Sequence, residues 1–83
     1  MQSPAEDDAD KGLVGRNIVL ARRLDGDISQ PVLAKRLGID RRQLSEWERG
    51  IWEPSPRNLR KIALATGRSM EFFYERHDEA SPC

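Results

Sequence analysis

The sequence contains few of the residues on which enzymes, metalloproteins and disulfide-bonded proteins depend. Its 83 residues include one cysteine, one histidine and 6% aromatic residues. The lone cysteine, Cys83, has no partner for an intramolecular disulfide, and we expect a reduced thiol. His77 is the one imidazole, and we find no paired carboxylates, no nucleophile with a base and no metal-ligand cluster. We therefore predict that the protein is not an enzyme and uses neither a metal nor a cofactor.

Long apolar runs and a secretion signal are also missing. No stretch approaches the roughly 20 apolar residues of a membrane-spanning helix. The first residues, M-Q-S-P-A-E-D-D, lack the basic start and the apolar stretch of a signal peptide. We expect a cytoplasmic protein with no membrane partner, and no small-molecule ligand is evident from the sequence.

The chain has no surplus of charge, because 14 Lys and Arg residues balance 14 Asp and Glu residues. The charges are nevertheless unevenly distributed. Residues 11–70 hold 13 of the cations and 6 of the acidic residues, a net charge of +7, whereas residues 1–10 hold four acidic residues and no cation. A basic segment is typical of a nucleic-acid-binding domain. We predict a domain over residues 12–75, a disordered acidic tail over 1–11 and a flexible tail over 76–83.

Short apolar segments with helical spacing make up most of the predicted domain. The first runs from Leu13 to Leu24, and Gly26 follows it as a residue that tolerates the left-handed conformation after a helix. Candidate N-caps precede the later segments at Ser29, Asp40, Ser55 and Ser69. The side chains expected to face inward are Leu13, Val14, Ile18, Val19, Leu20, Ala21, Leu24, Val32, Leu33, Ala34, Leu37, Leu44, Trp47, Leu59, Ile62 and Ala63. Five short helices with short connections predict a compact all-α domain.

The stretch from Gln30 to Gly50 is the most informative part of the sequence. It reads Q-P-V-L-A-K-R-L-G-I-D-R-R-Q-L-S-E-W-E-R-G and indicates two amphipathic helices joined by a tight turn at Gly38. The second helix, over about residues 40–49, opens with two adjacent arginines at an exposed end. This layout is typical of a helix-turn-helix whose second helix enters the DNA major groove.

The pattern resembles the Cro/C1-type (XRE) helix-turn-helix family of phage and bacterial regulators, over roughly residues 15–74. The resemblance implies a lambda-repressor-like fold and sequence-specific binding to double-stranded DNA. It further implies a transcriptional regulator, with a repressor as the expected role, that joins the nucleoid when bound. The matching residues are Ser29, Gln30, Leu33, Ala34, Leu37, Gly38, Leu44, Ser45, Trp47, Glu48, Gly50, Pro54, Ser55, Leu59, Ile62 and Ala63.

The resemblance places the base-reading positions at Arg41, Arg42, Ser45 and Glu46. Arginine suits the O6 and N7 atoms of guanine, and glutamate can accept from the N4 amino group of cytosine, so we expect G·C pairs in the site. Glu46 has a second interpretation. Because it lies one helical turn after Arg42, its carboxylate would instead orient that guanidinium.

The resemblance also implies contacts around the recognition helix. Its phosphate-binding positions fall on Gln30, Arg49, Arg57 and Asn58. In relatives the glutamine also braces a recognition-helix side chain, which here is Arg41. A partly buried ion pair between Arg23 and Glu48 is implied as well, tying the first helix to the end of the recognition helix. The alternative for that pair is a fully solvated contact with no measurable effect on stability.

Two positions depart from the family pattern. Ile51 and Trp52 follow Gly50, where the family often places lysine or arginine to meet phosphate. These two side chains either pack under the loop or form part of a partner surface. Arg68 stands where an apolar residue is usual, so we expect different packing near that position.

One recognition helix reads only a few base pairs, so the resemblance implies an operator with an inverted repeat and a weak homodimer. The candidate dimer or partner surface comprises Trp52, Met70, Phe72 and Tyr74. Simple core packing is the alternative for the last three. A different function also stays open, namely a protein-interaction module or an antitoxin component that uses the same fold to bind a partner protein.

Overall fold

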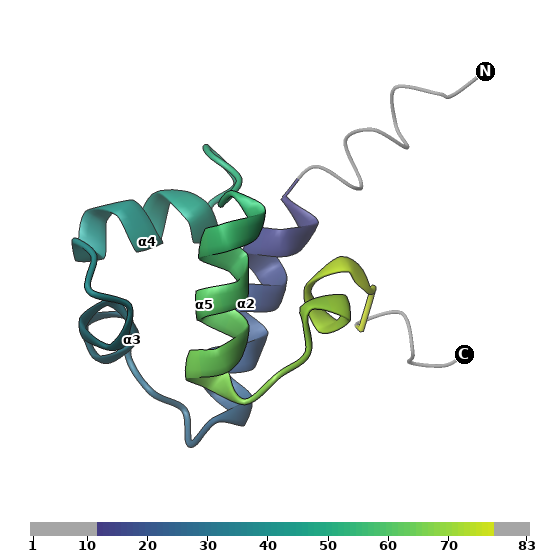
Figure 1. The fold of residues 1–83 in the computed structure, drawn as a ribbon, viewed down its shortest axis with the longest axis horizontal. Helices are drawn as coiled ribbons and strands as arrows, with labels where there is room; N and C mark the ends of the chain where they lie inside the picture. The colour runs from purple at the N-terminus through teal and green to yellow at the C-terminus, as the bar shows by residue number, and fades with distance from the viewer. Residues whose placement is uncertain (1–11, 78–83) are drawn as a thin grey trace.

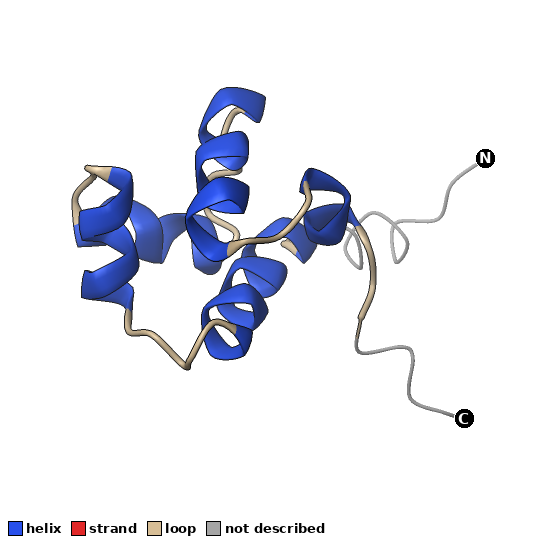
Figure 2. Cartoon of the chain, turned by 60° about the horizontal axis from the view of Figure 1, so that its bottom comes forward, coloured by secondary structure: helices blue, strands red, loops and turns tan. Residues whose placement is uncertain are grey.

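The computed structural model describes residues 12–77, which form four α-helices and a short 3-10 helix. The α-helices are α2 (Leu13–Leu24), α3 (Gln30–Leu37), α4 (Arg41–Glu48) and α5 (Pro56–Thr66), and the 3-10 helix is η1 (Met70–Tyr74). Every regular element in this part of the chain is helical (Figure 2). The tail predicted over 1–11, and the part of the C-terminal tail from residue 78 onward, lie outside the described residues.

The predicted N-caps are confirmed at α3, α4 and α5, and glycine ends are found at α3 and α5. The side chains of Ser29, Asp40 and Ser55 each accept a hydrogen bond from a backbone amide in the first turn of the helix that follows. Each bond pairs one of the amides that a helix start leaves without a partner. Gly38 and Gly67 end α3 and α5 in the left-handed region, with φ angles of 73° and 71°. The sequence alone therefore predicts these boundaries well.

Helices α2 and α5 form a central pair, with α3 and α4 on one side of it and η1 on the other (Figure 1). The core lies where these elements meet the central pair. Its largest fully buried side chains include Ile18 and Phe73. Burial of a side chain of that size stabilises the fold by roughly 1.5–3 kcal/mol. The core consists of Val14, Ile18, Ala21, Leu33, Ala34, Leu44, Trp47, Leu59, Ile62, Ala63 and Phe73.

Two apolar residues that were predicted to face inward lie at the surface instead. Leu24 is 51% exposed and Val32 is 43% exposed. Leu24 is the last residue of α2, where the chain turns away from the core. Val32 precedes the buried Leu33 by one residue, and one step along a helix rotates the side chain by about 100°. The apolar pattern therefore overestimates the width of the buried face.

The fifth predicted helix is a 3-10 helix. Residues 12–77 therefore contain four α-helices, not five. Its five residues are too few for a run of i→i+4 hydrogen bonds. Asn17 of α2, only 3% exposed, donates from Nδ2 to the backbone oxygens of Phe73 (2.9 Å) and Glu75 (2.7 Å). These bonds pair a buried amide and hold the end of η1 against α2.

The backbones of α2 and α4 come into direct contact at Gly15. A Cβ atom on Gly15 would lie 2.3 Å from the backbone oxygen of Trp47 and 2.7 Å from that of Glu48. Neither oxygen can move aside without shifting the last turn of α4. Glycine at this position is therefore required for space, and the contact determines where α4 ends relative to α2.

We predict that Gly15→Ala destabilises the protein by about 2 kcal/mol or more, because the added methyl group meets backbone atoms. The sign is informative, since alanine in a helix interior normally stabilises by about 1 kcal/mol relative to glycine. Urea denaturation followed by circular dichroism would measure the change. Arg60→Ala, at an exposed position of α5, is the control and should have little effect. A neutral or stabilising Gly15→Ala would contradict the close contact.

Candidate nucleic-acid interface

Helix α4 has one face in the core and one face in solvent. Leu44 and Trp47 are 0% and 4% exposed, and Glu48 at the end of the helix is 9% exposed. The outer face carries the exposed Arg41, Arg42 and Gln43 and the half-buried Ser45 and Glu46, and Arg49 follows as an exposed residue. All four predicted base-reading residues thus lie outside the core, on a helix held by its opposite side.

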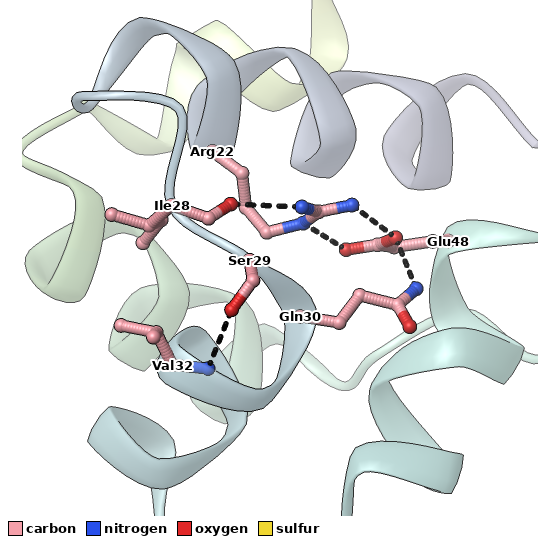
Figure 3. A network of polar contacts seen from close by, with 6 residues as sticks. All are labelled: Arg22, Ile28, Ser29, Gln30, Val32 and Glu48. Atoms are coloured by element: carbon pink, nitrogen blue, oxygen red, sulfur yellow. Dashed lines mark hydrogen bonds and ion pairs between the residues drawn. The ribbon is translucent and has the colours of Figure 1, made fainter.

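A polar network anchors the last residue of α4 to two other helices (Figure 3). Arg22 of α2 donates from Nε to Glu48 Oε2 (2.8 Å) and from Nη2 to Glu48 Oε1 (3.0 Å). A third guanidinium nitrogen, Nη1, donates to the backbone oxygen of Ile28 (2.9 Å), and Gln30 Nε2 donates to Glu48 Oε1 (2.6 Å). The side chains of Arg22 and Glu48 are 15% and 4% exposed. The bidentate geometry and the added hydrogen bonds compensate for taking the two charges out of water.

The prediction that Arg23 pairs with Glu48 is wrong by one position. Arg22 lies one helical turn after the buried Ile18, so its side chain leaves α2 on the inner side. Arg23 is rotated by about 100° from it and is exposed. Within the described residues the side chain of Arg23 has no hydrogen bond or ion pair, although it borders a shallow hollow beside Glu48.

The contact that Gln30 makes also differs from the prediction that this residue braces Arg41. Its amide nitrogen is bonded to Glu48, and its amide oxygen points away from that carboxylate (Figure 3). Gln30 is half-buried at the first residue of α3. It therefore links the start of α3 to the end of α4, at the opposite end of α4 from Arg41.

Arg42 and Glu46 form the i,i+4 pair that one of the two interpretations of Glu46 requires. Arg42 Nε lies 4.0 Å from Glu46 Oε2, with the two side chains 87% and 32% exposed. A pair this long and this exposed contributes little to stability. The pair places the more exposed guanidinium beside a less exposed carboxylate.

A model of the helix-turn-helix family matches residues 19–73, which is more than half of the chain. The chain belongs to this family. The match starts within α2, ends within η1 and includes α3, the turn at Gly38 and α4. It confirms the resemblance to Cro/C1-type (XRE) helix-turn-helix domains, and membership implies DNA binding. No curated protein matches the chain, and no solved structure does.

Apart from Gln30, the predicted phosphate-binding residues lie where α4 ends and α5 begins. Arg49 follows the last residue of α4 and is exposed. Arg57 is exposed in the first turn of α5, beside the half-buried Asn58, whose backbone amide donates to Ser55 Oγ (3.2 Å). The end of α4 and the start of α5 lie at the same edge of the molecule (Figure 1). These three residues therefore lie near the end of α4.

The four residues of the predicted dimer or partner surface separate into two groups. Met70 and Phe72 are partly buried and pack against the core. Trp52 and Tyr74 are 65% and 53% exposed. The structure thus assigns a packing role to the first pair and leaves the second pair open to solvent.

Arg68, which departs from the family pattern, lies over an aromatic ring. Its guanidinium carbon lies 5.5 Å from the centroid of Phe72, a cation–π arrangement. His77, which the prediction assigned to the tail, stacks on the same ring with a centroid distance of 4.0 Å and approaches the backbone oxygen of Phe72 (2.7 Å). The ordered contacts therefore reach residue 77.

Neither a candidate metal site nor a membrane-spanning helix is found in residues 12–77. This region contains no group of three or more His, Cys, Asp or Glu residues placed to hold a metal ion. No helix within the same range has the length and apolar character needed to cross a membrane.

Sequence reasoning missed three residues that position α4 or η1, although each carried a signal. Asn17 is a polar residue on the apolar stripe that Val14 and Ile18 define. Gly15 interrupts a helical pattern, which often marks a close backbone contact. Arg22 also follows that stripe, one turn after Ile18. The resemblance drew attention to Arg23 and away from the helical spacing.

We predict that Arg22→Ala destabilises the domain by about 3 kcal/mol, because it leaves the buried Glu48 carboxylate without its cation. Arg23→Ala removes the same kind of side chain from the next position and should change stability by no more than about 0.5 kcal/mol. Urea titration of both variants measures the difference. Equal losses in the two variants, or a larger loss for Arg23→Ala, would refute this assignment.

Proposed function

We propose that this protein is a transcriptional regulator that binds double-stranded DNA in a sequence-specific manner and acts as a repressor. The observation that carries the proposal is the outer face of α4. It presents Arg41 and Arg42 to solvent, while the inner side of the same helix is buried through Leu44 and Trp47 and tied down through Glu48. A helix presented in this way fits the major groove, which is about 12 Å wide.

Sequence recognition would come from side chains that α4 holds in fixed directions. Arg41 and Arg42 can each donate two hydrogen bonds to a guanine, and each good bidentate contact is worth roughly 1–3 kcal/mol of discrimination. Ser45 lies on the same face with a hydroxyl group that can donate or accept. Glu46 supports this arrangement in its orienting role, because its carboxylate lies near Arg42 Nε. We therefore expect a site in which G·C pairs lie opposite the start of α4.

Binding strength would come largely from phosphate contacts around that face. Arg49 and Arg57 are exposed cations on either side of the loop that joins α4 to α5. Asn58 and Gln30 would add uncharged donors. Because each phosphate contact displaces counterions, affinity should fall steeply as the salt concentration rises.

Repression and dimerisation follow from the same interface. Occupying a site that overlaps a promoter is sufficient to repress, and it asks nothing of the protein beyond DNA binding. A single α4 reads only a few base pairs, so two copies on an inverted repeat give the selectivity that one lacks. Of the predicted dimer residues, Trp52 and Tyr74 are the exposed candidates for a weak contact between copies.

In-vitro selection from random duplex DNA at about 0.15 M salt should enrich sites with G·C pairs arranged as an inverted repeat. Arg41→Ala and Arg42→Ala should each weaken binding to the best site by roughly 1–3 kcal/mol and relax base preference at one position. Lys35→Ala, an exposed cation of α3, is the matched control and should leave the base preference unchanged. Failure to enrich any duplex would instead favour a protein-interaction module or antitoxin component.

Glu46→Gln distinguishes the two interpretations of Glu46. If the carboxylate orients Arg42, the variant should relax the preference for guanine opposite Arg42. The base preference at the neighbouring base pair should stay unchanged. If the carboxylate reads cytosine N4 directly, the variant should change the preferred base at a separate position. Repeating the selection with the variant measures both. An unchanged selected site would exclude both roles.

A further inference from the structure

The N-terminal segment carries the densest run of acidic residues in the sequence. Residues 6–10 read E-D-D-A-D, and residues 1–10 contain no cation. The domain that follows has the opposite sign, because residues 11–70 carry a net charge of +7. The acidic segment itself lies outside the described residues, but Gly12, close to where it joins the domain, lies within them. The position of Gly12 therefore decides which cations the acidic side chains can reach.

Gly12 lies beside the end of α4. A Cβ atom on Gly50 would lie 3.2 Å from the Cα atom of Gly12, so the two backbones pass close to one another. Both glycines also line one hollow together with the buried Trp47. The start of α2, the end of α4 and the start of α5 lie at one edge of the molecule (Figure 1). The acidic segment therefore joins the domain next to the last residues of α4.

Exposed cations are concentrated around this end of α4, and they are Arg16, Arg23, Arg49 and Arg57. Arg16 and Arg23 border the hollow beside Glu48, whose own charge is paired with Arg22. Arg49 and Arg57 lie before and after the loop that joins α4 to α5, and Glu53 is the acidic residue within that loop. The end of α4 is therefore a basic surface, and two of its arginines are the predicted phosphate-binding cations.

The acidic side chains are tethered within reach of this surface. A chain extends by about 3.5 Å per residue, so Asp10 lies within roughly 7 Å of Gly12 and Glu6 within roughly 20 Å. Opposite charges attract over a Debye length of about 10 Å at 0.1 M salt. A short tether also gives the segment a local concentration in the millimolar range, which favours contacts that are individually weak. Residues 6–10 thus offer the arginines an intramolecular substitute for DNA phosphates.

The acidic residues that follow α5 are placed differently. Glu71 lies in η1 and Glu75 follows it, and both are exposed. Helix η1 packs on the opposite side of α2 and α5 from α3 and α4 (Figure 1). With Asp78 and Glu79 they form a set of four acidic residues, equal in number to the N-terminal set. The charge near the end of α4 therefore comes from the N-terminal set.

We propose that residues 6–10 act as an internal competitor of DNA for the arginines at the end of α4. This inference rests on the proposed function, in which Arg49 and Arg57 bind phosphates. Duplex DNA has to displace the acidic segment, so affinity is lowered most at low salt, where the attraction is strongest. The displaced carboxylates also replace part of the counterion release that accompanies phosphate binding, which makes the salt dependence of binding shallower.

Neutralising the segment in the full chain tests the proposal with the selected duplex. A variant with Glu6→Gln, Asp7→Asn, Asp8→Asn and Asp10→Asn should bind about three- to tenfold more tightly at about 0.05 M salt. Its log affinity should fall more steeply with log salt and should meet that of the unaltered protein near about 0.5 M. The matched control is Glu71→Gln, Glu75→Gln, Asp78→Asn and Glu79→Gln. It changes the net charge equally and should alter affinity by less than about twofold.

The outcomes separate this inference from the proposed function. Unchanged affinity in the neutralised variant, or an equal gain in the control, would overturn the inference and leave the proposed function standing. A loss of stability in urea without a gain in affinity would overturn it too, because the carboxylates would then serve the positive end of α2. Failure of the unaltered protein and of the neutralised variant to select any duplex would remove both proposals.

Nuclear magnetic resonance gives a second readout that needs no DNA. In the unaltered protein the amide signals of Arg49 and Gly50 should shift as salt is raised from about 0.05 to about 0.5 M, because screening releases the acidic segment. The neutralised variant should lose most of this response, and the control variant should retain it. Equal responses in the unaltered protein and the neutralised variant would contradict the contact.

Discussion

The carboxylate of Glu48 is the point on which the arrangement of the helices depends. It is nearly inaccessible to solvent, and it accepts hydrogen bonds from Arg22 of α2 and Gln30 of α3. A buried carboxylate is unfavourable unless its charge and its lone pairs have partners. The partners here come from different helices, so satisfying one side chain fixes three elements relative to one another. Gly15 complements this network by allowing the backbone of α2 to touch the end of α4.

This anchoring has a direct consequence for DNA recognition. Base discrimination requires donors held within a few tenths of an ångström of their acceptors, and a loosely attached helix would lose that precision. In this domain the buried side of α4 meets the core through Leu44 and Trp47, and its last residue is held by the Glu48 network. The outer side then carries polar and cationic residues that lie outside the core. Stability and the proposed recognition of DNA are therefore assigned to opposite sides of one short helix.

Much of the fold could be predicted because it depends on local chemistry. Caps such as Ser29 and Asp40, and a glycine end such as Gly38, act within a few residues of their own position. The outward location of Arg41 and Arg42 follows from the same local periodicity once the inner face is known. Features that depend on contacts with a second helix were harder to predict. The short η1 needs Asn17 from the opposite end of the chain to complete its hydrogen bonding.

The sequence by itself determined the helix boundaries, the inner and outer faces of α4 and the separation of a basic domain from acidic ends. The helical spacing after Ile18 favours Arg22 over Arg23 as the inward residue, but only the tertiary structure decided that Arg22 meets Glu48. Arg22 and Arg23 are adjacent and chemically identical, and the rotation of α2 against the core directs one inward and the other into solvent. The tertiary structure also left Trp52 uncovered at the edge of α4. In each case the deciding quantity is the direction of a side chain relative to another helix, which a linear sequence does not specify.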